Sequence, residues 1–72
     1  MDPQATWAEI LRALAESDPD SCAEACQHLR NWIEKGGFPP AITGIAEIDS
    51  VMAQAVCIHI LKRTFPERRK QP

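Results

Sequence analysis

The chain has 72 residues, of which 44% are hydrophobic and 25% are charged. This composition is typical of a globular protein and excludes wholesale disorder, and the length allows one small domain. A single core in a chain of this size rarely contributes more than about 3–5 kcal/mol to stability. Self-association is therefore a reasonable expectation before any residue is considered.

The net charge of −2 combines an acidic body with a basic C-terminal end. Residues 1–61 contain three basic and nine acidic residues, whereas residues 62–72 contain five basic residues and one acidic residue. An acidic body repels polyanions, so a contact with nucleic acid or another anionic partner has to rest on the basic end. Its basic residues are Lys62, Arg63, Arg68, Arg69 and Lys70.

Neither the N-terminus nor the most apolar segment predicts a membrane location. The first residues lack the basic region and apolar run of a secretory signal. Residues 45–61 are too few to span a bilayer and include Glu47, Asp49 and His59. The three cysteines are an odd number and leave no closed set of disulfides, so we expect free thiols and a cytoplasmic location.

Two amphipathic helices are expected in the first half of the chain, at residues 3–16 and from Pro19 to about residue 35. Asp2 and Asp18 each precede a proline, which is the pattern of a helix cap followed by a first helical residue. The short break between the helices makes them antiparallel neighbours. Their apolar stripes comprise Trp7, Ile10, Leu11 and Leu14 in the first helix, and Cys22, Ala25, Cys26, Leu29, Trp32 and Ile33 in the second.

A connector with loop character follows the second helix. Gly36 and Gly37 favour a helix end, and two prolines then prevent the helix from resuming. Apolar residues in the connector indicate that it packs on the bundle, with a short helical turn as an option at residues 40–43. Thr43 is the expected cap of a third helix that runs to about Thr64.

The third helix is unusually apolar. Its apolar residues cover an arc of about 200° on the helix, whereas a surface helix needs only about 100°. We therefore expect this helix to be covered from two sides, within one chain or between two. The arc comprises Ile45, Ile48, Val51, Met52, Ala55, Val56, Ile58 and Ile60. His59 falls near the centre of this arc, whereas Cys57 and Leu61 fall on the opposite face.

Few residues suggest chemistry. Cys22 and Cys26 are one helical turn apart, and His59 offers a third ligand from the facing helix, which makes these residues weak candidates for a metal site. No fourth ligand completes the set, and cysteines in an apolar stripe usually act as small hydrophobes. We expect no metal, no cofactor and no small-molecule substrate.

His59 has two interpretations. It is either a hydrogen-bonded histidine at the edge of the core or of an interface, or a pH-sensitive group or metal ligand. No residues combine a nucleophile, a base and an oxyanion holder, so we expect no catalytic residues and no enzyme.

The sequence thus predicts an all-α three-helix bundle, made of a helical hairpin and a longer, very apolar third helix. Residues 1–65 form one domain, followed by a basic flexible tail at 66–72. We expect a non-enzymatic protein–protein interaction module that forms a homodimer or docks on a larger protein. Its expected interface residues are Val51, Met52, Ile58, His59, Leu61 and Phe38.

The alternative function is that of a small nucleic-acid-associated regulatory protein that uses the basic tail. The third helix opens with Glu47 and Asp49, which disfavours a role as a DNA recognition helix. Association through the tail would depend steeply on salt, whereas association through an apolar face would not.

Overall fold

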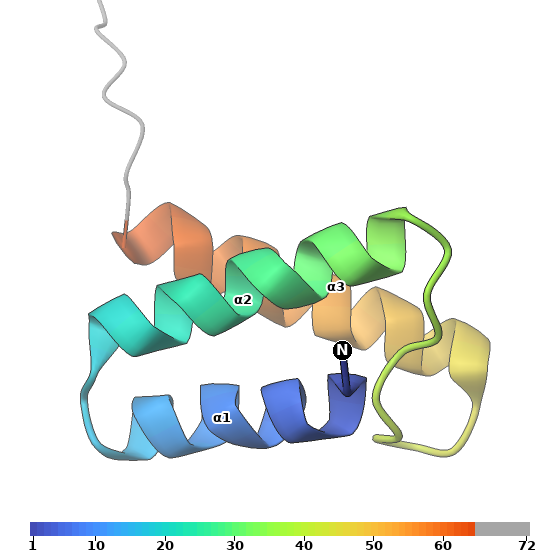
Figure 1. Ribbon diagram of the computed structural model, residues 1–72, viewed down its shortest axis with the longest axis horizontal. Helices are drawn as coiled ribbons and strands as arrows, with labels where there is room; N and C mark the ends of the chain where they lie inside the picture. The colour runs from blue at the N-terminus through green and yellow to red at the C-terminus, as the bar shows by residue number, and fades with distance from the viewer. Residues whose placement is uncertain (65–72) are drawn as a thin grey trace, which may run out of the picture.

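The computed structural model describes residues 1–64, and within this range it contains three α-helices and no strand (Figure 1). Helix α1 spans Pro3–Ala15, α2 spans Pro19–Glu34 and α3 spans Ala46–Thr64. The prediction of an all-α protein with a helical hairpin and a longer third helix is confirmed. The predicted tail at 66–72 lies outside the described residues.

Aspartate caps begin the first two helices, as predicted. The Asp2 carboxylate accepts hydrogen bonds from the backbone N–H groups of Gln4, at 3.0 Å, and Ala5, at 3.3 Å. Asp18 accepts one from the N–H of Ser21 at 3.3 Å. A proline in the first turn of each helix costs no hydrogen bond, because N–H groups at that position have no intrahelical partner.

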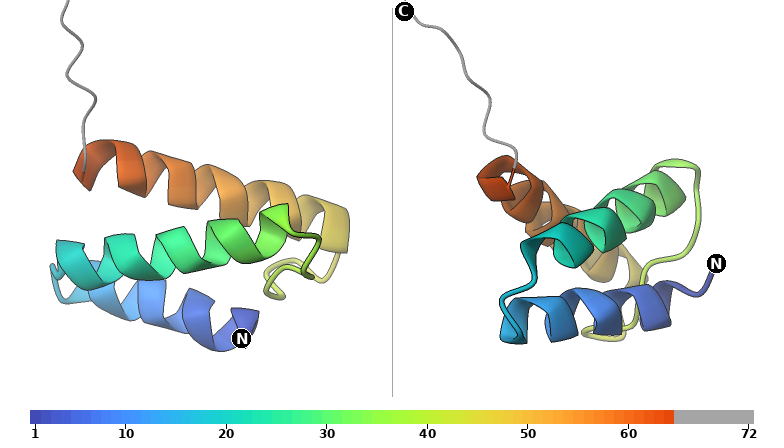
Figure 2. Two further views of the ribbon diagram at one scale, coloured as in Figure 1. Left: turned by 45° about the horizontal axis from the view of Figure 1, so that its top comes forward. Right: turned by 60° about the vertical axis from the view of Figure 1, so that its left-hand side comes forward.

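Helix α2 lies in the middle of the molecule. It packs against both α1 and α3, which make few contacts with each other (Figure 2, left). The third helix therefore crosses the hairpin on its α2 side and does not fill a groove between α1 and α2. The core residues are mostly small and comprise Ile10, Ala13, Cys22, Ala25, Cys26, Leu29, Ala53, Cys57 and Ile60.

The buried side of α3 differs from the one predicted. Cys57, which we placed opposite the core, is fully buried, whereas His59, which we placed near the centre of the apolar arc, is exposed. The prediction was wrong because it placed the bulkiest apolar residues inside. Since α2 presents cysteines and alanines, α3 packs closely on it by turning its own small residues, Ala53 and Cys57, inward.

The stripe predicted for α1 is also only partly buried. Ile10 is inaccessible to solvent, but Leu11 and Leu14 remain 49% and 51% exposed. These leucines lie to one side of the contact with α2. They would be covered if α1 and α3 closed over α2, but the two outer helices make few contacts.

The connector between α2 and α3 is an irregular loop, and the optional helical turn at 40–43 does not form. Gly36 adopts a φ of +92°, as expected for a glycine that ends a helix. The Trp32 indole N–H donates to the Phe38 carbonyl at 2.8 Å, and the two rings meet edge to face. At the far end of the loop, the Ala41 N–H donates to the Gln4 side chain at 2.7 Å.

Replacing Leu29 with alanine tests the position of the core. Leu29 is fully buried, so Leu29→Ala should lower the free energy of unfolding by about 2–5 kcal/mol. Leu11→Ala is the matched control, because half of this side chain is already in water, and it should cost less than about 1 kcal/mol. Chemical denaturation of both variants measures the difference, and equal losses would contradict the packing described here.

Candidate interaction surface

A buried aspartate fixes the start of α3. The Asp49 side chain is 2% exposed, and its carboxylate accepts four hydrogen bonds from the preceding loop. Its donors are the N–H groups of Ile42, Thr43 and Gly44, at 3.1, 2.7 and 3.2 Å, and the Thr43 hydroxyl at 2.7 Å. Such bonds to a charged acceptor are about twice as strong as neutral ones. The loop is therefore held over the first turns of α3.

We call these four hydrogen bonds to the Asp49 carboxylate the clasp. Two features of α3 are connected with it. The helix begins at Ala46, so Thr43 is not its cap, and the Thr43 hydroxyl instead accepts a hydrogen bond from the Ile45 N–H at 3.1 Å. Burial raises the pKa of Asp49, but the hydrogen bonds from the loop outweigh it and hold the pKa below the ordinary value. The side chain is thus ionised, and its inward direction sets the rotation of the helix.

The opposite side of α3 is apolar and exposed. We call it the outward face and define it by Ile48, Val51, Met52, Ala55 and Ile58. The exposed fractions of the four larger side chains range from 38% for Ile58 to 68% for Val51. The five positions recur at intervals of three and four residues, so they form one stripe on the side away from α2. Larger exposed apolar patches of this kind often mark surfaces that bind other proteins.

The outward face has the spacing of a seam between two helices. Ile48, Val51, Ala55 and Ile58 are separated by three, four and three residues, which matches the a and d positions of a coiled coil. Single exposed apolar residues are common on protein surfaces, but scattered residues are not expected to keep this regular spacing over three helical turns. Ile48 and Ala55 belonged to the predicted arc but not to the predicted interface, and the heptad spacing is the signal that identifies them.

The residues predicted for the interface lie in three places. Val51, Met52 and Ile58 are on the outward face, and His59 is exposed beside it. Leu61 is half-buried and packs against the core. Phe38 is 66% exposed but lies on the connector, where it contacts Trp32 of α2. Four of the six predicted interface residues therefore lie together on the exposed side of α3.

Charge is distributed unevenly along α3. Glu47 lies in the first turn, whereas Lys62 and Arg63 lie in the last, and all three are exposed. This order complements the helix dipole, which favours anions at the N-terminus and cations at the C-terminus. The other basic residues that we predicted for an anionic partner, Arg68, Arg69 and Lys70, lie outside the described range.

The three cysteines are free and buried between the helices. The Cys22 thiol donates a weak hydrogen bond to the Ile10 carbonyl at 3.9 Å, and burial raises the pKa of Cys22 to about 11. The neighbouring Cys57 thiol, together with burial, raises the pKa of Cys26. Neutral thiols of this kind act as small apolar side chains and are poor nucleophiles.

The weak metal candidates do not assemble. Cys22 and Cys26 are in the core, whereas His59 is on the exposed side of α3. Among residues 1–64, no group of three or more His, Cys, Asp or Glu side chains is arranged to hold a metal ion.

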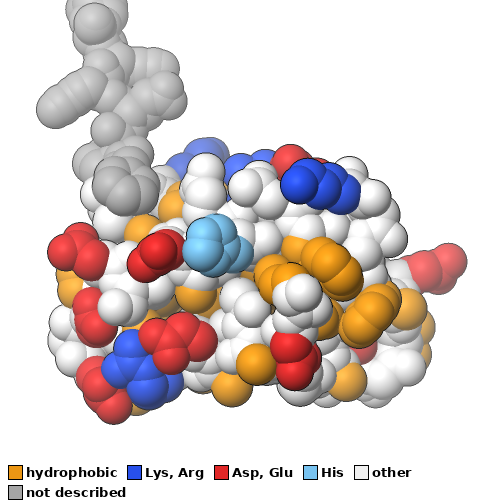
Figure 3. All heavy atoms as spheres, viewed as in Figure 1, with side chains coloured by type: hydrophobic (Ala, Val, Ile, Leu, Met, Phe, Trp, Pro, Cys, Tyr) orange, Lys and Arg blue, Asp and Glu red, His pale blue; other side chains and the backbone are white. Residues whose placement is uncertain are grey.

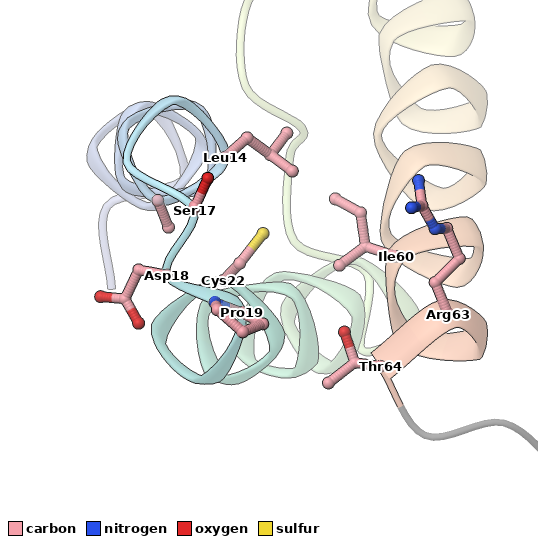
Figure 4. Close-up of a pocket in the computed structure, with 9 residues that line it drawn as sticks. Leu14, Ser17, Asp18, Pro19, Cys22, Ile60, Arg63 and Thr64 are labelled. Carbon is pink, nitrogen blue, oxygen red and sulfur yellow. The ribbon is translucent and has the colours of Figure 1, made fainter.

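A cavity of about 420 Å³ opens where α1 and α3 diverge, near the turn between α1 and α2 (Figure 4). Leu14 and Ile60 point toward each other from the two outer helices, and the Cys22 thiol points between them. Arg63 and Thr64 line the side formed by α3. The cavity shows that the three helices do not enclose the core completely.

Charged side chains gather over part of α1. Figure 3 shows a basic group among acidic ones at the lower left, over α1. Arg12 of α1 forms ion pairs with Glu9, Glu16 and Asp18. Such exposed pairs contribute little to stability, about 0–1 kcal/mol each.

Comparison of the chain with protein-family models, curated proteins and solved structures finds no match. In the part of the chain that the structure covers, no helix is long and apolar enough to cross a bilayer. Any functional inference for this chain therefore rests on its own surfaces.

Replacing Asp49 with asparagine removes the charged acceptor from the loop. Asp49→Asn should lower the melting temperature by more than about 5 °C at neutral pH, because an amide cannot accept all four hydrogen bonds. The pKa of Asp49 is lowered in the folded state, so its contribution is present above the unfolded value of about 3.9 and is lost as the pH falls. The variant should accordingly lose less stability on acidification.

Thermal unfolding followed by circular dichroism between neutral and acid pH measures both effects. Asp20→Asn is the control, since Asp20 is exposed in the first turn of α2. An unchanged melting temperature for Asp49→Asn would show that the clasp does not stabilise the fold.

Thiol labelling tests the burial of the cysteines. A thiol reagent near pH 8 should modify none of the three in the folded chain and all three in denaturant, because the reagent cannot reach thiols that are buried between the helices. The raised pKa of Cys22 favours the neutral form in the fold, so its contribution to stability should fall as the pH rises above about 9. Rapid labelling without denaturant would contradict the described core.

Proposed function

We propose that the chain is a non-enzymatic protein–protein interaction module that self-associates through the outward face of α3. The observation that carries this proposal is the exposed stripe of Ile48, Val51, Ala55 and Ile58 on the side away from α2. Neither α1 nor α2 covers this stripe, because α1 and α3 make few contacts and α2 packs on the other side.

The energetic case rests on how much apolar surface each copy leaves in water. Fully burying an aliphatic side chain contributes about 1.5–3 kcal/mol, so burying one that is about half exposed contributes roughly 1 kcal/mol. A symmetric dimer buries the large members of the face twice. Association costs about 4–15 kcal/mol, so we expect a dimer of modest affinity whose population depends on concentration.

The alternative function, association with nucleic acid through the basic end, remains a prediction. Within the described residues it is supported by Lys62 and Arg63, which are both exposed in the last turn of α3. It differs from the first proposal in salt dependence, because phosphate contacts release counterions and weaken steeply as salt increases. An apolar interface keeps its strength in high salt.

Molar mass in solution tests the main proposal. Light scattering on a size-exclusion column, at several protein concentrations and at low and high salt, should show a dimer in both salts. Val51→Glu should raise the dimer dissociation constant at least about tenfold, because it buries an unpaired charge in the interface. Leu11→Glu is the matched control on α1, since Leu11 is half exposed outside the outward face, and it should leave the molar mass unchanged.

Two results would count against this proposal. A chain that stays monomeric at every concentration would reject self-association, and equal effects of Val51→Glu and Leu11→Glu would reject α3 as the interface. Circular dichroism of each variant verifies that the helices remain intact.

A further inference from the structure

We infer that the outward face of α3 pairs with the same face of a second copy in antiparallel orientation, with the two-fold axis close to Ala55. This inference rests on the proposed function and specifies its geometry. It follows from the position of the face, its steric profile and the order of charges along the helix.

The position of α3 leaves room for a second helix. The outward face is on the side away from α2, and α3 lies at the edge of the three-helix arrangement (Figure 2, left). A second copy can therefore approach α3 without meeting α1 or α2. Because both copies present the same surface, a two-fold axis satisfies both at once and closes the assembly at two chains.

The steric profile of the face places its closest approach near Ala55. Ala55 is the smallest residue of the stripe, with Val51 one turn before it and Ile58 one turn after it. Two helices that cross at a small residue approach closely, and the larger side chains on either side then interdigitate. An axis just before Ala55 places Ile58 of each copy level with Val51 of the other, so the two larger side chains meet on either side of the closest approach.

The order of charges selects the antiparallel orientation. Glu47 lies just before the stripe and Lys62 just after it, and both are exposed. In an antiparallel pair centred near Ala55, each Glu47 lies opposite Lys62 of the other copy, which forms two equivalent attractive pairs. The antiparallel helix dipoles reinforce this orientation. In a parallel pair, Glu47 would face Glu47 and Lys62 would face Lys62, which is repulsive.

Disulfide trapping distinguishes the two orientations. Glu47→Cys and Lys62→Cys are made separately, and each is oxidised alone and in an equimolar mixture. The antiparallel arrangement predicts a cross-linked product in the mixture and little in either variant alone. The native cysteines should not interfere under folding conditions, because all three are buried.

A charge exchange provides an independent readout in the uncross-linked protein. Glu47→Lys and Lys62→Glu should each raise the dimer dissociation constant about threefold to tenfold at low salt, and the double variant should restore the original value within about twofold. Sedimentation equilibrium at low and high salt measures these constants, and high salt should reduce the differences.

The outcomes separate this inference from the function it rests on. Cross-linking of Glu47→Cys with itself, or a double variant weaker than both single variants, would overturn the antiparallel geometry while the dimer remained. A dimer that Val51→Glu leaves intact would place the interface elsewhere. A parent chain that is monomeric at every concentration would overturn both.

Discussion

The clasp between Asp49 and the loop before α3 determines which side of this helix faces the core. The Asp49 carboxylate is almost completely buried, and it accepts four hydrogen bonds, from the backbone N–H groups of Ile42, Thr43 and Gly44 and from the Thr43 hydroxyl. A buried charge is tolerated only when it is satisfied in this way. Because a helix is rigid, directing Asp49 inward determines the direction of every other side chain on α3.

The small residues of the core also favour this rotation of α3. Helix α2 contributes cysteines and alanines, and α3 meets them with Ala53 and Cys57. This contact allows close approach but buries only a few large side chains, of which Leu29 is one. Six of the eight residues of the predicted apolar arc of α3 remain exposed as a result. A close-packed centre and an exposed apolar face are therefore two consequences of the same rotation of one helix.

The proposed self-association would cover the exposed apolar face and add to the small amount of apolar surface that the core buries. A second α3 would cover the isoleucines and the valine that the fold leaves exposed, and it would add apolar contacts that a chain of this size lacks on its own. The acidic start and basic end of α3 favour an antiparallel partner, and the same order of charges stabilises the isolated helix through its dipole. The interface and the stability of the helix thus draw on the same residues.

The helices could be predicted from the sequence, because their signals are local. The Asp-Pro pairs at Asp2 and Asp18 and the glycine at Gly36 act through neighbouring backbone groups, so the ends of α1 and α2 could be predicted from a few residues. The buried side of α3 could not be predicted in the same way. An apolar arc of about 200° leaves the rotation of a helix open. That choice depended on the irregular loop five to seven residues before Asp49, which has no regular pattern to predict, and on how Cys57 fits against α2, a contact between residues that only the folded chain brings together.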